Sequence, residues 1–104
     1  MDERQLEQEI QDKNLNAPRL TPEWVSSVIV SSDYHIFKDT CLTVCCLTLQ
    51  NGFTVTGESA CASPENFDKE IGETIAYDNA RNKIWALEGY LLRETIHRDG
   101  VNYE

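Results

Sequence analysis

LTLQNGFTVTGESACASPENF, which runs from Leu47 to Phe67, decides the fold of this chain. It predicts a strand, a tight turn, a second strand, a loop and the start of a helix. The runs CLTVCCLTLQ and FTVTG beside the turn are rich in β-branched and apolar residues, which favour strands. Asn51 and Gly52 both tolerate the positive φ of a type I′ turn, so the sequence predicts a hairpin with a two-residue loop.

A two-residue loop also fixes the register of the hairpin. It predicts that Gln50 pairs with Phe53 and Thr48 with Val55. The two faces of the sheet would then carry, on one side, Val44, Cys46, Phe53 and Val55, and on the other side Cys45, Leu47, Leu49, Thr54 and Thr56. Neither face is strongly polar, and a sheet that is apolar on both faces needs cover on both. We therefore expect the chain to assemble as a homo-oligomer.

A long helix is expected to follow the hairpin, from Pro64 to about Ile96. Ser63 is the expected N-cap, because Pro is well tolerated at the first helical position that follows it. Apolar residues then recur at helical spacing, as Phe67, Ile71, Ile75, Ala76, Ala80, Ile84, Leu87 and Leu91. Gly72 interrupts this pattern, and it is expected either to kink the helix or to split it in two.

Upstream of the hairpin, Thr21 and Pro22 predict the start of a short helix that extends to about Ser31. Residues 34–37 are expected to form the first strand. The predicted fold class is therefore α+β, a three-stranded antiparallel β-meander with a short N-terminal helix and a long C-terminal helix with a candidate kink. Residues 1–16 form a polar N-terminal segment without a firm cap, expected to be frayed or to be helical only against a partner. Residues 17–104 form a single α+β domain.

The charge of the chain limits its partners. Its 104 residues carry a net charge of −9, which argues against binding a nucleic-acid polymer or an anionic membrane. No apolar run approaches the roughly 18 residues of a membrane span, and no signal-peptide pattern is present, so we expect a cytoplasmic protein. The four cysteines, Cys41, Cys45, Cys46 and Cys61, form no CxxC motif and are expected to be free, buried thiols. No metal or cofactor is predicted.

The sequence points to binding and not to catalysis, because it contains no nucleophile elbow, P-loop, GxGxxG or HExxH. At the predicted helix start, the free amides beside Ser63 would favour an anion, and Asn66 could bind an adenine edge. Phe53 and Phe67 offer faces for base stacking. Each has a plain structural alternative, since Ser63 can serve only as a cap, Asn66 can satisfy the helix end and Phe67 can belong to the core.

Two further candidates lie along the predicted long helix. Asn79 sits close to the apolar stripe, where a polar side chain needs a partner. Arg93 could meet a phosphate if a partner chain lies nearby, or it could be a solvated surface charge. Trp85 and Tyr90 lie off the apolar stripe, which favours a protein interface over exposure to solvent.

Three segments, APRLTPEW, CCLTLQNGFTVTGESACASPENFDKEIG and NKIWALEGYLLR, resemble the phage protein family known by its gene-49 and gene-66 founding members. The likeness runs from about Ala17 to Arg93. More distantly, the chain resembles a phage anti-defence family of sponges, which sequester the cyclic ADP-ribose signal of the Thoeris system and in some cases cyclic oligonucleotides. That resemblance implies a small homo-oligomer in the host cytoplasm that binds its ligand between protomers without cleaving it, by aromatic stacking together with polar and Arg contacts.

The expected function is therefore a phage anti-defence sponge for a small cyclic nucleotide. The candidate ligand-binding residues, chosen from local chemistry, are Phe53, Ser63, Asn66, Phe67, Asn79 and Arg93. The alternative is a phage accessory protein that binds and inhibits a host protein through Trp85, Tyr90 and the acidic N-terminus. A hydrolase of the same signals is a weaker third hypothesis, because no residues for turnover are evident.

Overall fold

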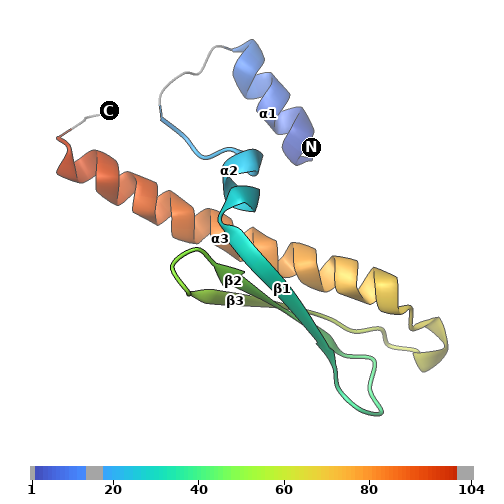
Figure 1. The fold of residues 1–104 in the computed structure, drawn as a ribbon. Helices are drawn as coiled ribbons and strands as arrows, with labels where there is room; N and C mark the ends of the chain where they lie inside the picture. The colour runs from blue at the N-terminus through green and yellow to red at the C-terminus, as the bar shows by residue number, and fades with distance from the viewer. Residues whose placement is uncertain (1, 14–17, 101–104) are drawn as a thin grey trace.

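A three-stranded antiparallel sheet lies against one long helix in a computed structural model of the chain, which describes residues 2–13 and 18–100 (Figure 1). The strands are adjacent in chain order, so the sheet is a simple meander. The elements are α1 (Glu3–Asp12), α2 (Pro22–Ser27), β1 (Ile29–Ile36), β2 (Thr43–Leu49), β3 (Thr54–Ser59), the 3₁₀ turn η1 (Pro64–Asn66) and α3 (Lys69–Arg98). The predicted α+β class and the meander are confirmed.

The long helix α3 is continuous through Gly72, so the alternative of a split helix is wrong. Gly72 is buried on the face of α3 that meets the sheet, where a Cβ atom would lie 3.0 Å from Oγ1 of Thr43. This glycine is therefore explained by the close approach of the helix to β2, and the ordinary loss of helix propensity at glycine is offset by packing.

The start of α3 is five residues later than the sequence predicts. Ser63 makes no side-chain cap, and Pro64–Asn66 forms only one 3₁₀ turn, after which Phe67 is extended. The carboxylate of Asp68 is the actual cap, because it accepts a hydrogen bond of 3.0 Å from the backbone amide of Ile71. An acidic cap also complements the positive end of the helix dipole.

The hairpin between β2 and β3 has a three-residue loop, Gln50–Gly52, and not the predicted two-residue loop. The Leu49 amide donates to the Phe53 carbonyl at 2.8 Å, and the Gly52 amide donates back to the Leu49 carbonyl at 2.9 Å. Within this loop only Gly52, with φ of 88°, adopts the left-handed conformation. Asn51 instead uses its side-chain oxygen to accept from the Phe53 amide at 3.0 Å. This is a type I turn followed by a glycine bulge.

The longer loop shifts the register by one residue, so every side chain of β3 lies on the face of the sheet opposite to the predicted one. Leu47 now pairs with Val55, and Thr48 pairs with Thr54. Val55 therefore joins Leu47 on the face that meets α3, while Thr54 turns to the opposite face. The predicted sheet with two apolar faces is wrong for this reason, since a one-residue slip exchanges the faces of β3.

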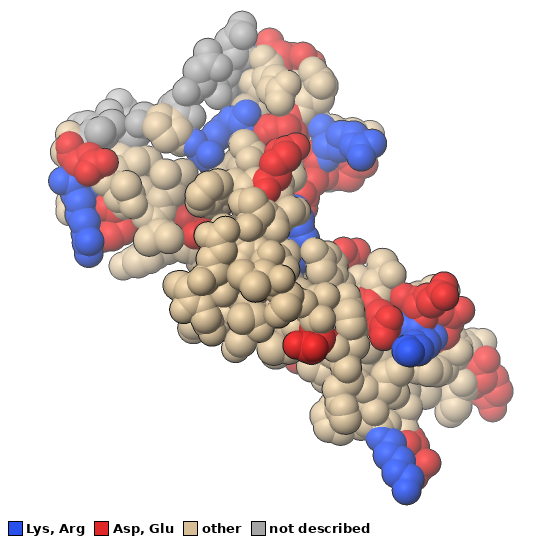
Figure 2. Space-filling model, viewed as in Figure 1, with Lys and Arg blue, Asp and Glu red and all other residues tan. Residues whose placement is uncertain are grey.

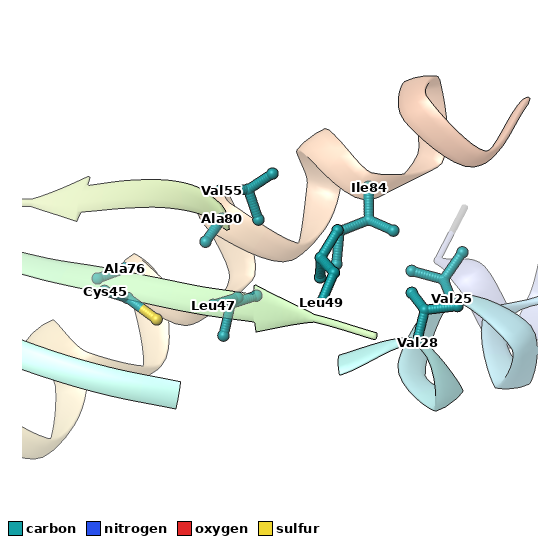
Figure 3. Close-up of a cluster of buried hydrophobic side chains, with 9 residues drawn as sticks. All are labelled: Val25, Val28, Cys45, Leu47, Leu49, Val55, Ala76, Ala80 and Ile84. Atoms are coloured by element: carbon teal, nitrogen blue, oxygen red, sulfur yellow. The ribbon is translucent and has the colours of Figure 1, made fainter. Parts of the chain in front are cut away.

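The hydrophobic core lies between the sheet and α3, with α2 closing one end (Figure 3). Burial alternates along β2, as expected for a strand covered on one face. The buried apolar residues are Val25, Val28, Cys45, Leu47, Leu49, Val55, Ala76, Ala80 and Ile84. In Figure 3 their side chains point toward one another from α2, β2, β3 and α3.

Gly57 on β3 sets the distance between the sheet and the helix. A Cβ atom at this position would lie 2.2 Å from the backbone nitrogen of Ala80 and 2.3 Å from the backbone oxygen of Ala76. Both alanines are fully buried. The backbone of α3 therefore rests directly on β3, which only a glycine facing small helical residues permits.

The opposite face of the sheet is uncovered within the described residues. Val44, Cys46 and Thr48 of β2 are half-buried there, and Thr54 and Thr56 of β3 are exposed. This face is rich in threonine, so it does not need a covering element, unlike the apolar face that the sequence predicts. The homo-oligomer stays a prediction.

Before the second strand, the observed bounds of α2 and β1 differ from the predicted ones. The predicted cap of α2 is confirmed, because Oγ1 of Thr21 accepts from the Trp24 amide at 3.1 Å. The helix ends at Ser27 and β1 already begins at Ile29, five residues before the predicted strand. The β-branched run Val28-Ile29-Val30 favours this early strand.

The N-terminal helix α1 is firmly capped, contrary to expectation. Asp2 accepts from the Gln5 amide at 2.8 Å, and the Gln5 side chain accepts from the Asp2 amide at 3.1 Å, which is a capping box. None of the residues of α1 is buried. In Figure 1 this helix lies apart from the sheet, beyond α2.

Candidate ligand-binding groove

An open groove of about 490 Å³ lies between α2, the tip of the β2–β3 hairpin and the C-terminal half of α3. We call it the aromatic groove, after Trp24, Phe53 and Tyr90, which line it together with Leu87 and Leu91 of α3. Leu87, Tyr90 and Leu91 are spaced by three and four residues, so they share one side of the helix. Each element thus contributes at least one large apolar side chain to the same surface.

The walls of the groove are fixed by hydrogen bonds between its elements. The backbone amide of Gln50 donates to the Val28 carbonyl at 3.0 Å, and the Gln50 side chain donates to the Ser27 carbonyl at 3.0 Å. These two bonds tie the hairpin tip to the end of α2. The groove therefore has preorganised walls, which reduces the entropy lost when a ligand binds.

The lining side chains are unusually exposed for their size. The exposed fraction is 76% for Tyr90, 58% for Leu91, 54% for Phe53 and 53% for Trp24. Single exposed apolar residues are common, but a contiguous group of them marks a binding surface. The aromatic groove is such a group, which makes it the candidate site.

The electrostatics of the groove are mildly acidic. Glu88 and Glu94 line it, and no Lys or Arg does among the described lining residues. Glu94 is paired with Arg98, whose Nε lies 3.0 Å from the carboxylate. Figure 2 shows uncharged residues across the middle of the same view, where the hairpin lies in Figure 1, with charged side chains gathered toward the ends of the molecule.

The structure divides the predicted site residues among separate places. Phe53 lies in the aromatic groove, whereas Ser63, Asn66 and Phe67 lie around η1, beyond the other end of β3 (Figure 1). Arg93 is exposed on α3 and is outside the groove lining. One protomer therefore does not bring these residues into a single pocket.

The side chain of Asn79 has a hydrogen-bond partner within the protomer. Its side-chain nitrogen donates to the backbone oxygen of Glu58 on β3 at 2.8 Å. The bond ties the middle of α3 to the outer strand of the sheet. Asn79 thus has a structural role in the protomer.

The predicted anion site at the helix start loses its physical basis. Asp68, and not Ser63, caps α3, and its carboxylate takes the Ile71 amide that an anion would need. Glu70 in the first helical turn and Glu65 in η1 add further negative charge. The positive helix dipole at this end is therefore already compensated.

Sequence reasoning missed Trp24, Leu87 and Leu91 as parts of a site. The helical pattern places the two leucines with the core stripe of α3, because at about 100° per residue Leu87 and Leu91 share the side of the helix that carries Ala76, Ala80 and Ile84. They are exposed because this part of α3 extends past the tip of the hairpin (Figure 1). The pattern of the helix alone therefore gave no signal of their exposure.

The two aromatics set aside as interface candidates have different environments. Tyr90 is highly exposed and belongs to the aromatic groove. Trp85 is half-buried and packs against the core cluster, so it extends the core. Of the two, Tyr90 is the one available to a partner.

The described residues offer few other kinds of site. Among them, no group of three or more His, Cys, Asp and Glu side chains is placed to hold a metal ion. In the same part of the chain, no helix is both long and apolar enough to span a bilayer. The four cysteines are all free, and burial raises the pKa of the Cys45 thiol, which favours its neutral form.

Fold and surface together define a small α+β protein with one preorganised aromatic groove. Residues 20–96 match the phage protein (N4 Gp49/phage Sf6 gene 66) family, and the chain belongs to this family of phage proteins. The matched region begins just before α2 and includes the sheet and almost all of α3, but not α1. No curated protein and no solved structure matches the chain.

Proposed function

We propose that this phage protein is a non-catalytic sponge that binds and sequesters a small cyclic nucleotide immune signal of the host in its aromatic groove. The observation that carries the proposal is the convergence of Trp24, Phe53 and Tyr90 on one open groove of about 490 Å³. Small-molecule sites typically measure about 300–1,000 Å³ and are lined mainly by apolar and aromatic residues. Stacking on an aromatic side chain contributes about 1–3 kcal/mol per nucleobase.

Polar groups beside the aromatics suit a nucleobase edge. Gln50 and Asn51 line the groove at the hairpin tip, and side-chain amides pair with base edges through donor and acceptor atoms. Among the described lining residues there is no Ser, Cys or His. This composition favours retention of the ligand over its turnover.

The phosphates of a cyclic nucleotide need positive charge that the groove lacks. Glu88 and Glu94 would repel phosphates placed beside them. Arg93 is exposed on the same half of α3, and an arginine presented by a second copy could pair bidentately with phosphate. The proposal therefore includes a homo-oligomer in the host cytoplasm as the working form.

Recovery of intact ligand tests the function. The purified protein is incubated with a panel of cyclic ADP-ribose isomers and cyclic di- and trinucleotides, unbound ligand is removed, and heat releases what was retained. An unchanged compound, released in proportion to protein, supports sequestration and identifies the ligand class. A converted compound would make the protein an enzyme, and an empty panel would remove the support for a sponge.

Substitutions then locate the site. Phe53→Ala and Tyr90→Ala should each weaken retention by about 5- to 150-fold, the loss of one stacking contact, while Phe37→Ala, at an exposed aromatic outside the groove, serves as the matched control. Asn66→Ala and Phe67→Ala test the helix-start site. If these two variants lose the ligand and the groove variants keep it, the groove is the wrong location even though sequestration stands.

A second candidate function is a phage accessory protein that binds and inhibits a host protein. The exposed apolar side chains at Tyr90 and Leu91, with Glu88 and Glu94 beside them, favour it. A protein partner would be lost on Tyr90→Ala but would be insensitive to competition by any cyclic nucleotide. Competition in a pull-down from host extract therefore separates the two functions.

A further inference from the structure

Cys41 and Cys61 face each other just past the end of the β2–β3 ladder. The last pair in the register is Thr43 with Ser59. Cys41 lies two residues before Thr43, and Cys61 lies two residues after Ser59. The strands themselves end there, and continuing their antiparallel register by two residues would set the two cysteines opposite each other.

The side chains of this pair are close enough to influence each other. The neighbouring thiol of Cys61 is the main cause that raises the pKa of Cys41, and burial raises it further. Both cysteines are free and half-buried. Opposed residues in an antiparallel pair have Cα atoms about 4.5–5.5 Å apart, which lies within the roughly 4.4–6.8 Å that a disulfide spans.

The other two cysteines have no such partner. Cys45 is fully buried and pairs with Tyr34 and Gly57, and Cys46 on the uncovered face pairs with Asp33 and Thr56. Adjacent residues of one strand point to opposite faces, so Cys45 and Cys46 cannot join each other in the folded chain. The register therefore leaves Cys41 and Cys61 as the two cysteines placed to form a disulfide.

We propose that Cys41 and Cys61 form a modification site, a dithiol that exchanges with a low-molecular-weight disulfide such as oxidised glutathione. One thiolate attacks a sulfur of the small disulfide, forming a mixed disulfide and releasing one glutathione thiol. The second thiolate then attacks the protein sulfur of that mixed disulfide, closes the Cys41–Cys61 bond and releases the second glutathione. The protein loses two hydrogens and two electrons, and the small disulfide gains them.

The bond would join the start of β2 to the loop that leads from β3 into η1 and α3. Cross-linking these points restricts the unfolded chain and raises the stability of the folded one. It would also fix the segment that carries Ser63 and Asn66. Oxidation thus acts on the end of the molecule opposite the aromatic groove.

Thiol counting and peptide mapping test the site on the full chain. Incubation with oxidised glutathione should reduce the four free thiols to two. The intact mass should fall by two hydrogens without dimer formation, and proteolysis should yield one cross-linked peptide with Cys41 and Cys61. The unfolding temperature should rise by several degrees and return on reduction with dithiothreitol. Because the pKa of Cys41 is raised, closure should be faster at higher pH, where more of its thiolate is present.

Three variants make the test decisive. Cys41→Ser and Cys61→Ser should each stop at a stable glutathione adduct on the remaining cysteine of the pair and show no rise in unfolding temperature. Cys46→Ser should behave as the parent protein. Four unchanged thiols, or a cross-link through Cys46 between chains, would overturn the proposal.

Discussion

The two halves of α3, residues 69–84 and 85–98, carry small or apolar residues on the same face but have opposite surroundings. In the first half, Gly72, Ala76, Ala80 and Ile84 are buried against the sheet. In the second half, Leu87, Tyr90 and Leu91 remain exposed. The difference is that β2 and β3 lie against the first half only, while the second extends past the hairpin tip (Figure 1). An apolar stripe thus belongs to the core only as far as its partner reaches, and beyond that it is exposed.

Gly57→Val should have the largest effect on stability, because the new side chain would collide with the backbone of α3 at Ala76 and Ala80. A clash with backbone cannot be relieved by a rotamer change. We expect a loss of about 3 kcal/mol or more, or failure to fold, measured by chemical denaturation. Thr56→Val, on the uncovered face of the same strand, is the matched control. A stable Gly57→Val protein would mean that α3 does not rest on β3.

Ile84→Ala and Leu91→Ala compare the two halves directly. Ile84 is fully buried, so its truncation should lower the free energy of unfolding by about 2–5 kcal/mol. Leu91 is 58% exposed, so its truncation should change stability by about 0.5 kcal/mol or less. The proposed function adds that Leu91→Ala weakens ligand retention. Equal destabilisation by the two variants would contradict the division of the helix.

Thr43→Val tests the packing beneath the first half of α3. The Thr43 hydroxyl is buried and has no hydrogen-bond partner within the described residues. Valine has the same shape without the unsatisfied oxygen, so the variant should be more stable by about 1–2 kcal/mol. Thr48→Val, half-buried on the uncovered face, should show little change. Destabilisation by Thr43→Val would indicate that the hydroxyl is satisfied in solution.

Asp68→Ala and Ser63→Ala locate the beginning of the buried half. Loss of the Asp68 cap should cost about 1 kcal/mol in the free energy of unfolding. Ser63 makes no side-chain cap bond, so its replacement should cost almost nothing. The reverse order of the two effects would restore Ser63 as the start of the helix. Thermal denaturation of both variants resolves the difference.

Local chemistry was enough to predict the order of the main elements. The Thr21 cap and Pro22 predict α2, and the hairpin and the apolar repeat predict β2, β3 and α3 from neighbouring residues alone. The predictions that were wrong, the turn type and the cap of α3, concern places where two local structures suit the sequence equally well. Asn51-Gly52 suits both a type I′ turn and a glycine bulge, and Ser63 and Asp68 are both good caps. In the hairpin, the register adopted is the one that buries Val55 against α3.

The groove was harder to predict than the fold. Of the six candidate ligand-binding residues, only Phe53 lies in it. Trp24 and Tyr90 come from segments far apart in the chain. Long-range hydrogen bonds hold α2, which carries Trp24, in place, from Gln50 to the carbonyls at its end and from Arg81 of α3 to Pro22 and Ser26. No local pattern encodes those contacts. The sequence therefore offered Phe53 as a candidate for stacking, but not the place where the aromatic side chains gather.

The hydrogen bond from Asn79 protects the edge strand β3 against the addition of strands from other copies of the protein. Leu49 bonds to Phe53 across the hairpin, so by the alternation of an antiparallel ladder the backbone of Glu58 points away from β2, toward the free edge. A free edge is a template on which further strands can add, and the growth of fibrils begins at such edges. Asn79 occupies the Glu58 carbonyl and so removes one acceptor from the template. Asn79, a candidate ligand-binding residue from its sequence position, thus helps to keep copies of the protein from joining edge to edge.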